Sequence, residues 1–218
     1  MNLDPNELYT RLMLAESDLD SLEILPLGGP EGDDEPIEMP EELSILPLRN
    51  TVLFPGVVLP ITVGRDKSIK AVNEAYKGDK LIGVVAQKDS NVEDPSVKDL
   101  EEIGTVARIV KLIKMPDGGT TIIIQGKNRF AIESITGEDP YFKAKIRKLD
   151  EEESPKDEDF NAYVANIKDL AADIVQLSPN IPAEASIILR NIENPSFLIH
   201  FVSSNLNTDI RDKQKLLE

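Results

Sequence analysis

The chain has 218 residues, of which 40% are hydrophobic and 29% charged, a composition typical of a folded globular protein with one or two domains. It contains no cysteine, which excludes disulfides, thiolate metal sites and a thiol nucleophile. The net charge of −16 is uneven, because residues 1–44 carry 13 acidic residues and one basic residue. No apolar run of about 18 residues is present, and the acidic start lacks the basic region of a secretory signal. The cytoplasm is therefore the expected compartment, and no membrane partner is expected.

Residues 1–42 are predicted to form an acidic, largely flexible leader. Its second part, 28–42, is rich in Gly, Pro and acids and has too little apolar surface to order itself. Ahead of it, Asp4, Pro5 and Glu7 match the start of a short helix. This pattern is interpreted either as a nascent helix in a mobile leader or as a helix that docks on another surface.

Residues 43–150 are predicted to form a small, mainly antiparallel β-barrel with one early helix, followed by an all-α subdomain, which gives an α+β fold class. Apolar or alternating runs predict strands, in chain order, at 43–48, 58–64, 80–87, 103–115, 120–135 and 141–149. The segment PDGG at 116–119 predicts a hairpin between the two longest strands. A sheet of this size is expected to close into a barrel.

The early helix is expected over 65–79. Asp66 is the expected cap, and Gly78 is the expected end. Ile69, Val72 and Tyr76 recur at helical spacing and are expected to face inward.

Residues 151–218 are predicted to form the helical subdomain. Five residues at spacings of three and four predict one buried stripe of a long helix: Phe160, Val164, Ile167, Ala171 and Ile174. Further helices are expected to start at Pro182, with Ala185, Ile188, Leu189 and Ile192 inward, and at Pro195. The last helix starts near Thr208 and reaches Glu218 without a stop signal, so the chain is expected to be part of a longer protein.

Catalytic chemistry is expected to be absent from this chain. His200 is the one histidine and lies among serines on a predicted helix, which favours a surface or cap-like role. The Gly-Lys pair at Gly126 lacks the earlier Gly and the following Ser or Thr of a phosphate-binding loop. No catalytic, metal-binding or cofactor-binding residue is therefore predicted.

The stretch ILPLRNTVLFPGVVLPITVGRDKSI resembles the entry to the N-terminal domain of the Lon family of ATP-dependent proteases. The fixed elements of that pattern are all present: Pro47, Leu48, Arg49, Val52, Phe54, Pro55, Gly56, Pro60, Val63, Gly64 and Arg65. The resemblance continues through VVAQKD and LEEIGTVARIVKLIKMPDGGTTIIIQGKNRFAI, and more weakly through the helical part. It covers about residues 43–218, and the long acidic leader departs from the family's pattern.

The resemblance implies a PUA-like pseudo-barrel that recognises misfolded, damaged or selected regulatory proteins. Family members continue into an ATPase module of the AAA+ class and a protease domain with a Ser–Lys dyad, and they assemble as homohexamers. ATP and Mg²⁺ would belong to those absent modules, and this part of the chain would bind no cofactor. Its expected partners are unfolded or damaged proteins and the other subunits of the hexamer.

The candidate substrate-binding residues come from two apolar segments that contain proline. They are Phe54, Pro55, Val57, Val58, Met115 and Pro116. For the segment around Phe54 two interpretations stay open, since these side chains either close one end of the barrel as core or remain exposed as a patch for unfolded polypeptide.

Two other classes of function compete with this one. The chain is alternatively a free-standing domain of the same fold that binds a peptide or a small ligand. A third class is an RNA-binding module, because Lys143, Lys145, Arg147 and Lys148 form a basic row on one strand. That row has no interleaved exposed aromatic side chain for base stacking, so a nucleic-acid partner is not favoured.

The leader also contains a short internal repeat. Ile24–Leu27 of the leader has the same four residues as Ile45–Leu48 of the first strand. Chance explains so short a match, but a second copy of a strand sequence is also able to pair with the same apolar surface. Residues 20–27 are therefore hypothesised to compete with substrate inside the same chain.

Overall fold

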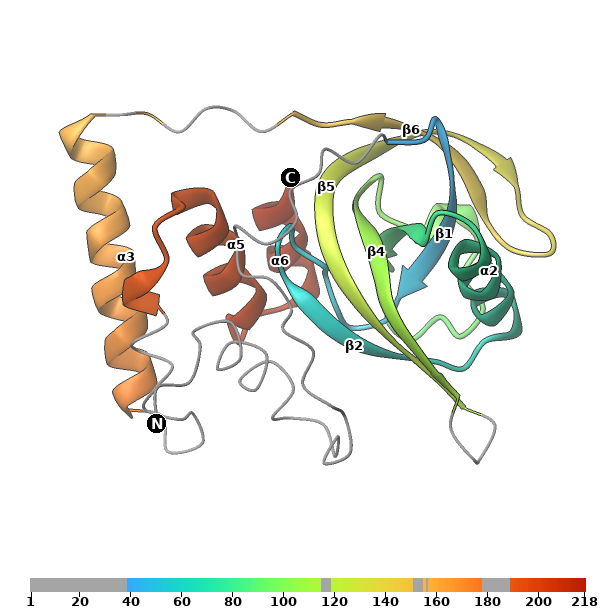
Figure 1. The fold of residues 1–218 in the computed structure, drawn as a ribbon, viewed down its shortest axis with the longest axis horizontal. Helices are drawn as coiled ribbons and strands as arrows, with labels where there is room; N and C mark the ends of the chain where they lie inside the picture. Colours follow the sequence, from blue (N-terminus) through green and yellow to red (C-terminus); the bar gives the residue numbers. More distant parts are fainter. Residues whose placement is uncertain (1–38, 115–118, 151–154, 156, 178–188) are drawn as a thin grey trace. The chain divides into compact units, whose positions relative to one another are not determined.

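The protein is described by a computed structural model that covers residues 39–114, 119–150, 155, 157–177 and 189–218 (Figure 1). The chain divides into two compact units. One contains 37–150 together with 203–218, and the other includes 151–202.

A six-stranded mixed sheet forms the body of the first unit. Its strands are β1 (Glu42–Leu48), β2 (Val58–Val63), β3 (Leu81–Ala86), β4 (Ile103–Lys114), β5 (Thr120–Gly137) and β6 (Lys143–Lys148). Their order is β2-β5-β4-β3-β1-β6, and β6 also pairs with β5. The five strands β5, β4, β3, β1 and β6 are therefore paired in a closed circuit. Only the β1–β3 pairing is parallel among the described strands. Each of the six predicted strands is present, although the parallel pair was not predicted.

The long strand β5 links the two ends of this sheet (Figure 1). Its first part pairs with β2 through Thr120–Gln125, and its later part, from Phe130 to Gly137, pairs with β6. Register shifts in the β4–β5 and β5–β6 pairings mark bulges. Because a bulge bends a strand and increases its twist, these irregularities let β5 pair with β2 near its start and with β6 near its end.

The helix α2 (Asp66–Lys77) packs against β1 and β3. Its buried residues are Ser68, Ala71, Val72 and Ala75. Gly78 ends it as predicted, since its N–H donates to Glu74 and Ala75. The expected cap is wrong, because Arg65 is the N-cap residue and Asp66 is the first helical residue. Tyr76 is also not buried: it is 36% exposed and stacks under the Lys80 ammonium.

The apolar interior of the sheet forms two clusters. The first joins the buried face of α2 to side chains from five strands, including Leu46, Ile82, Ala107 and Ile122. The second surrounds Phe130 and contains, among others, Leu43, Ile45, Leu81, Val85, Leu100, Val106, Phe142, Ala144 and Ile146. Phe142, Ala144 and Ile146 thus face inward as predicted. The short 3₁₀ helix η1 (Val97–Asp99) lies before β4 and is closed by a capping box between Ser96 and Asp99.

The last helix, α6 (Ile210–Leu217), belongs to the unit of the sheet. Its Gln214 side chain donates from Nε2 to the Ile103 carbonyl at 3.1 Å, and Arg129 Nη1 donates to the Leu217 carbonyl at 2.8 Å. A cation at a helix C-terminus satisfies carbonyls that lack helical partners. From the sequence, this helix was predicted to belong to the helical subdomain. Its amphipathic pattern shows that one face is buried but does not reveal which part of the protein covers that face.

The second unit contains α3 (Glu158–Leu177) and most of α5 (Pro195–Asn205). Their shared core consists of Ala171, Val175, Leu189, Ile192, Phe197, Leu198 and Phe201. Asn194 Oδ1 accepts the Phe197 N–H at 3.1 Å and so begins α5 next to Pro195, where the sequence predicted a start. Ile174 was expected in the buried stripe, but it is 57% exposed and Val175 is buried instead. The predicted helix start at Pro182 lies outside the described residues.

Candidate functional site

The candidate segment at Phe54 forms a tight turn that is sealed against the sheet. The Val57 N–H donates to the Phe54 carbonyl at 3.2 Å, and Gly56 lies between them with a φ of 77°. Pro in the second position and a positive φ in the third are typical of a type II turn, so glycine is required at Gly56. Proline and glycine therefore reverse the chain here rather than expose it.

Backbone contacts with β5 fix this turn in place. The Gly56 N–H donates to the Gly126 carbonyl at 2.9 Å, and the Gly126 N–H donates to the Val57 carbonyl at 2.8 Å. A Cβ atom at Gly126 would lie 2.2 Å from the Phe54 carbonyl oxygen, so this close approach requires glycine. The buried Thr105 hydroxyl donates to the Leu53 carbonyl at 2.6 Å.

The structure therefore decides between the two interpretations of this segment. Phe54 and Val57 are 0% exposed, Val58 is 2% exposed, and Pro55 is also buried. Of the two interpretations, the structure shows the core: the turn closes onto β4 and β5, and these side chains are not exposed as a patch. Met115 and Pro116 lie outside the described residues, and their role stays a prediction.

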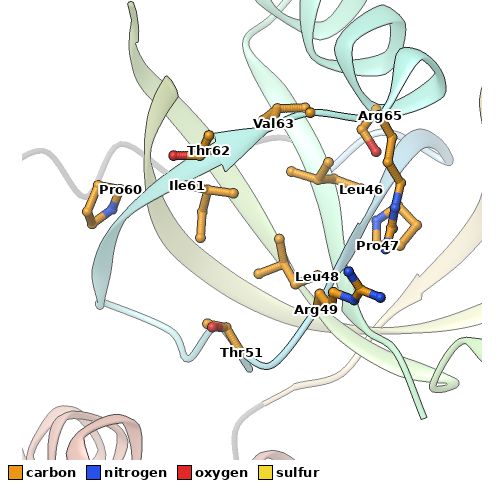
Figure 2. Close-up of a pocket in the computed structure, with 12 residues that line it drawn as sticks. Leu46, Pro47, Leu48, Arg49, Thr51, Pro60, Ile61, Thr62, Val63 and Arg65 are labelled. Carbon is orange, nitrogen blue, oxygen red and sulfur yellow. The ribbon is translucent and has the colours of Figure 1, made fainter. Parts of the chain in front are cut away.

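A pocket of about 360 Å³ opens between β1, β2 and the start of α2 (Figure 2). β1 pairs with β3 and β6, and β2 pairs with β5, so no backbone pairing joins β1 to β2. The lining comes from the C-terminal half of β1, from β2 and from the first turn of α2: Leu46, Pro47, Leu48, Arg49, Thr51, Pro60, Ile61, Thr62, Val63, Gly64, Arg65 and Ser68.

Two arginines occupy one wall of this pocket (Figure 2). Arg65 Nη2 donates to Gln87 Oε1 at 2.6 Å, and Arg49 Nε donates to the Ser90 carbonyl at 2.5 Å. Gln87 is itself buried and donates from Nε2 to the Val92 carbonyl at 3.0 Å, which fixes the orientation of its amide. Each guanidinium thus has a defined position and keeps further N–H groups for another partner.

The electrostatics of the pocket are positive on this wall. Burial lowers the pKa of Arg65, and the nearby positive charge of Arg49 lowers it further, while Asp94 and Glu93 act in the opposite direction. Among the described residues, neither arginine has a carboxylate within 4.0 Å. The wall therefore carries two cations that are not directly neutralised.

A second feature of interest is the exposed apolar face of α3. It consists of Tyr163, Leu170, Ile174 and Leu177, which are all largely exposed. Their spacing of seven, four and three residues places them on one side of the helix. A row of large apolar side chains on one face is typical of a surface that contacts another polypeptide.

The basic row on β6 is present but partly engaged. Arg147 lies 3.7 Å from the Glu133 carboxylate, Lys148 lies 3.3 Å from Asp150, and Lys143 lies over the Tyr141 ring at 5.5 Å. These contacts reduce the positive charge that a nucleic acid would meet. They favour the interpretation of this strand as a solvated sheet face.

Within the described ranges, no group of three or more His, Asp or Glu side chains is arranged to bind a metal ion. His200 is half-buried on α5. No helix in the described part of the chain is long and apolar enough to cross a membrane.

Sequence reasoning missed the pocket. Arg49 and Arg65 were both recognised as fixed positions of the motif, yet neither was named as a site residue. A usable signal was present, because Arg49 directly follows the end of β1 and Arg65 lies two residues after the end of β2, in a stretch with few other charges. What the sequence did not reveal is that β1 and β2 remain unpaired with each other.

Comparison with known proteins identifies the family. The family model described as the ATP-dependent protease La (LON) substrate-binding domain matches residues 42–218. The Lon protease of Flavobacterium johnsoniae is 52% identical over 209 residues, and the Lon protease of Cytophaga hutchinsonii is 48% identical over 204 residues. These alignments cover 94% and 92% of this chain but only 26% and 25% of the two relatives. The chain thus spans about a quarter of the length of the Lon proteases that it matches.

Solved structures show the same fold. The N-terminal domain of the Lon protease from the Mycobacterium avium complex superposes with a TM-score of 0.66 at 20% identity, covering 81% of this chain and 90% of that one. A Lon N-terminal domain protein from Xanthomonas campestris gives a TM-score of 0.58 at 15% identity, covering 81% and 89%. The resemblance predicted from the motif is confirmed, and the chain belongs to the family of Lon substrate-binding domains.

Proposed function

We propose that this chain is the part of an ATP-dependent protease that recognises and holds protein substrates. The observation that carries the proposal is the match of the substrate-binding family model to residues 42–218. The described residues add two surfaces suited to an extended polypeptide, the open pocket between β1 and β2 and the exposed apolar face of α3.

The finer architecture is part of this proposal. Residues 43–150 would act as a PUA-like pseudo-barrel, residues 151–218 as a helical subdomain whose last helix, α6, packs on the sheet, and residues 1–42 as a flexible leader. The pairing of β6 with both β1 and β5 supports a barrel-like closure, because it joins β5, β4, β3, β1 and β6 into a ring. β2 pairs with β5 and lies outside this ring.

The activity of the whole protein is proposed from its relatives. They are named Lon protease, and this chain spans about a quarter of their length. We propose that the complete protein is a cytoplasmic, homohexameric serine endopeptidase that uses ATP and Mg²⁺ in modules outside this chain. The sequence of the 218 residues contains no phosphate-binding loop, so this chain by itself is proposed to be catalytically inactive.

Binding by a single copy is expected to be weak. A pocket of about 360 Å³ and one helix face offer a small contact area, so a dissociation constant of about 1 μM or weaker is expected. Several copies in one assembly would raise the overall affinity without new contacts.

The proposal is tested with a permanently unfolded protein and its native form as the matched control. Titration of the isotope-labelled 218-residue chain, followed by NMR, should show shifts for the unfolded ligand only. The same preparation should neither hydrolyse ATP nor cleave the unfolded protein. Equal binding of the native and unfolded ligands would contradict the substrate-recognition role, and ATP-dependent cleavage would contradict the assignment of catalysis to other modules.

A free-standing domain that binds a peptide or small ligand is the second candidate. The pocket favours it, because its volume lies near the lower end of the range for ligand sites. The length of the gene product decides between the two candidates, since a Lon-type chain continues well beyond the length of this one.

A further inference from the structure

The pocket between β1 and β2 lies between two strand edges that share no backbone pairing. β6 pairs with Glu42–Ser44, and the Ile45 N–H donates to the Phe142 carbonyl at 2.8 Å. Among the described strands, the following residues of β1, 46–48, therefore pair with β3 alone, on one side. β2 is the end strand of the sheet, and β5 is its one partner within the described residues. Pro47 and Pro60 bring no N–H group, which disfavours direct pairing of the two edges across the gap. An extended chain in this gap would meet backbone acceptors on both sides.

The polar groups of the pocket favour an anion. Arg49 and Arg65 lie on one wall, and each is positioned by a hydrogen bond to an uncharged oxygen rather than to a carboxylate. Ser68 also lines the pocket and is only 7% exposed. It lies in the first turn of α2, where the helix dipole and free N–H groups also favour negative charge.

We propose that this pocket binds a carboxylate carried by an extended polypeptide segment, with Arg49 and Arg65 as its direct partners. The proposal rests on the proposed function and names the chemistry that the domain recognises. Apolar surfaces on other parts of the domain would bind unfolded chains in general. The pocket would add a preference for segments that carry an acidic side chain or a free C-terminus.

The physical basis is the difference between charged and neutral hydrogen bonds. A guanidinium–carboxylate pair forms charge-assisted and often bidentate bonds, which are about twice as strong as neutral ones. Burial and the nearby charge of Arg49 lower the pKa of Arg65, and a carboxylate that enters the pocket would offset the repulsion between the two cations. Asp94 and Glu93 offset part of this gain, so a moderate preference is expected rather than an absolute one.

Three blocked or free peptides of equal length test the proposal on the 218-residue chain. One carries a central Glu with both ends blocked, the second has Gln at that position, and the third is the Gln peptide with a free C-terminal carboxylate. The Glu peptide is expected to bind about tenfold more tightly than the blocked Gln peptide, which corresponds to about 1.4 kcal/mol. The third peptide shows whether a terminal carboxylate is accepted as well.

Substitutions locate the effect. Arg49→Gln and Arg65→Gln should each reduce the preference for Glu to less than about twofold. Lys70→Gln removes one charge from an exposed position on α2 and should leave the preference intact. The melting temperature of each variant is measured first, so that a loss of binding is compared only among folded proteins.

A steric variant tests the same site without changing charge. A Cβ atom added at Gly64 would meet no atom within 4 Å, and Gly64 lines the pocket, so Gly64→Leu should fold normally while it obstructs the pocket. Gly137→Leu is the matched control, because the nearest atom to an added Cβ there is 3.9 Å away and the residue does not line the pocket. Gly64→Leu should weaken the Glu peptide at least fivefold, and Gly137→Leu should not.

The outcomes separate this proposal from the function on which it rests. Equal binding of the three peptides, together with normal binding of an unfolded protein, would overturn the carboxylate pocket and leave substrate recognition intact. A preference for Glu that survives both arginine substitutions would also overturn it. Failure to bind either the peptides or the unfolded protein would remove both proposals.

Discussion

Two parts of one proline-rich stretch end in opposite environments. Residues 53–57 turn back onto β4 and β5 and become core, whereas residues 60–65 line an open pocket. Both parts are apolar and contain proline. The difference is that the first part is bound by the Gly126 backbone and the Thr105 hydroxyl, whereas one edge of β2 has no partner among the described strands. Composition therefore does not decide exposure here, and the availability of backbone partners does.

The largest expected effect comes from opening the sealed part. Gly126→Ala would place a Cβ atom 2.2 Å from the Phe54 carbonyl oxygen, which belongs to the backbone of a tight turn and cannot easily move aside. We expect a loss of about 3 kcal/mol or more in the free energy of unfolding, measured by urea denaturation. Gly137→Ala, with its nearest contact at 3.9 Å, is the control and should change stability by less than about 0.5 kcal/mol. Similar losses for both variants would show that the turn does not press on β5.

A smaller change in stability is expected when one hydroxyl is removed from the sealed turn and, for comparison, from the open pocket. Thr105→Val removes the buried donor to the Leu53 carbonyl and should destabilise the protein by about 1–2 kcal/mol. Thr62→Val makes the same chemical change at an exposed residue of the pocket, and its effect should stay within about 0.5 kcal/mol. Thermal denaturation of the two variants side by side measures the difference. A cost at Thr62 equal to that at Thr105 would mean that the pocket is not open.

The sequence predicted the local elements well, because they depend on local patterns. Continuous or alternating apolar runs marked the strands, and Gly78 marked the end of α2. The sequence did not predict the parallel β1–β3 pair or the gap between β1 and β2, since strand pairing is decided by residues far apart in the chain. The pocket depends on that gap, and so its two arginines were not identified as site residues.

The helix α3 also shows that a local pattern does not determine long-range packing. Its apolar residues cover more than one face, and the sequence predicted one stripe that included Ile174. In the structure the core takes Val175 and leaves Ile174 exposed beside Leu170 and Leu177. Periodicity identifies an amphipathic helix, but the packing partner selects which of two adjacent apolar rows is buried.

Deletion of the acidic leader tests whether the leader occupies the pocket that residues 60–65 line. Removal of residues 1–42 should leave the melting temperature nearly unchanged, because the sealed part is held by Gly126 of β5 and Thr105 of β4. Affinity for an unfolded peptide should rise several-fold at low salt and less at high salt, since attraction between the leader's carboxylates and the pocket is screened by ions. NMR shifts on deletion should appear at Thr62 and Gly64 and not at Val57. Unchanged affinity would show that the repeat Ile24–Leu27 is coincidental.

The smallest expected effect concerns the partly buried carboxylate of Glu101, which lies just before β4 and whose N–H donates to the Ala86 carbonyl. It contrasts with the partly buried cations of the pocket. Burial raises the pKa of Glu101, chiefly because its charged form loses contact with water, while Lys88 acts in the opposite direction. The ionised form is therefore disfavoured in the folded protein, and its cost is present at neutral pH and disappears as the pH falls through the raised pKa toward the ordinary value.

Glu101→Gln should thus stabilise the protein at pH 7 by roughly a few tenths of a kcal/mol, since the residue is only partly buried and solvent screens the effect. The difference between variant and parent should shrink on acidification and vanish once Glu101 is protonated in both the folded and unfolded states. Urea denaturation at a series of pH values measures it, with Glu102→Gln, at the exposed neighbouring position, as the control for the loss of one negative charge. A stabilisation that grows as the pH falls would have the wrong sign for a raised pKa and would contradict burial as its cause.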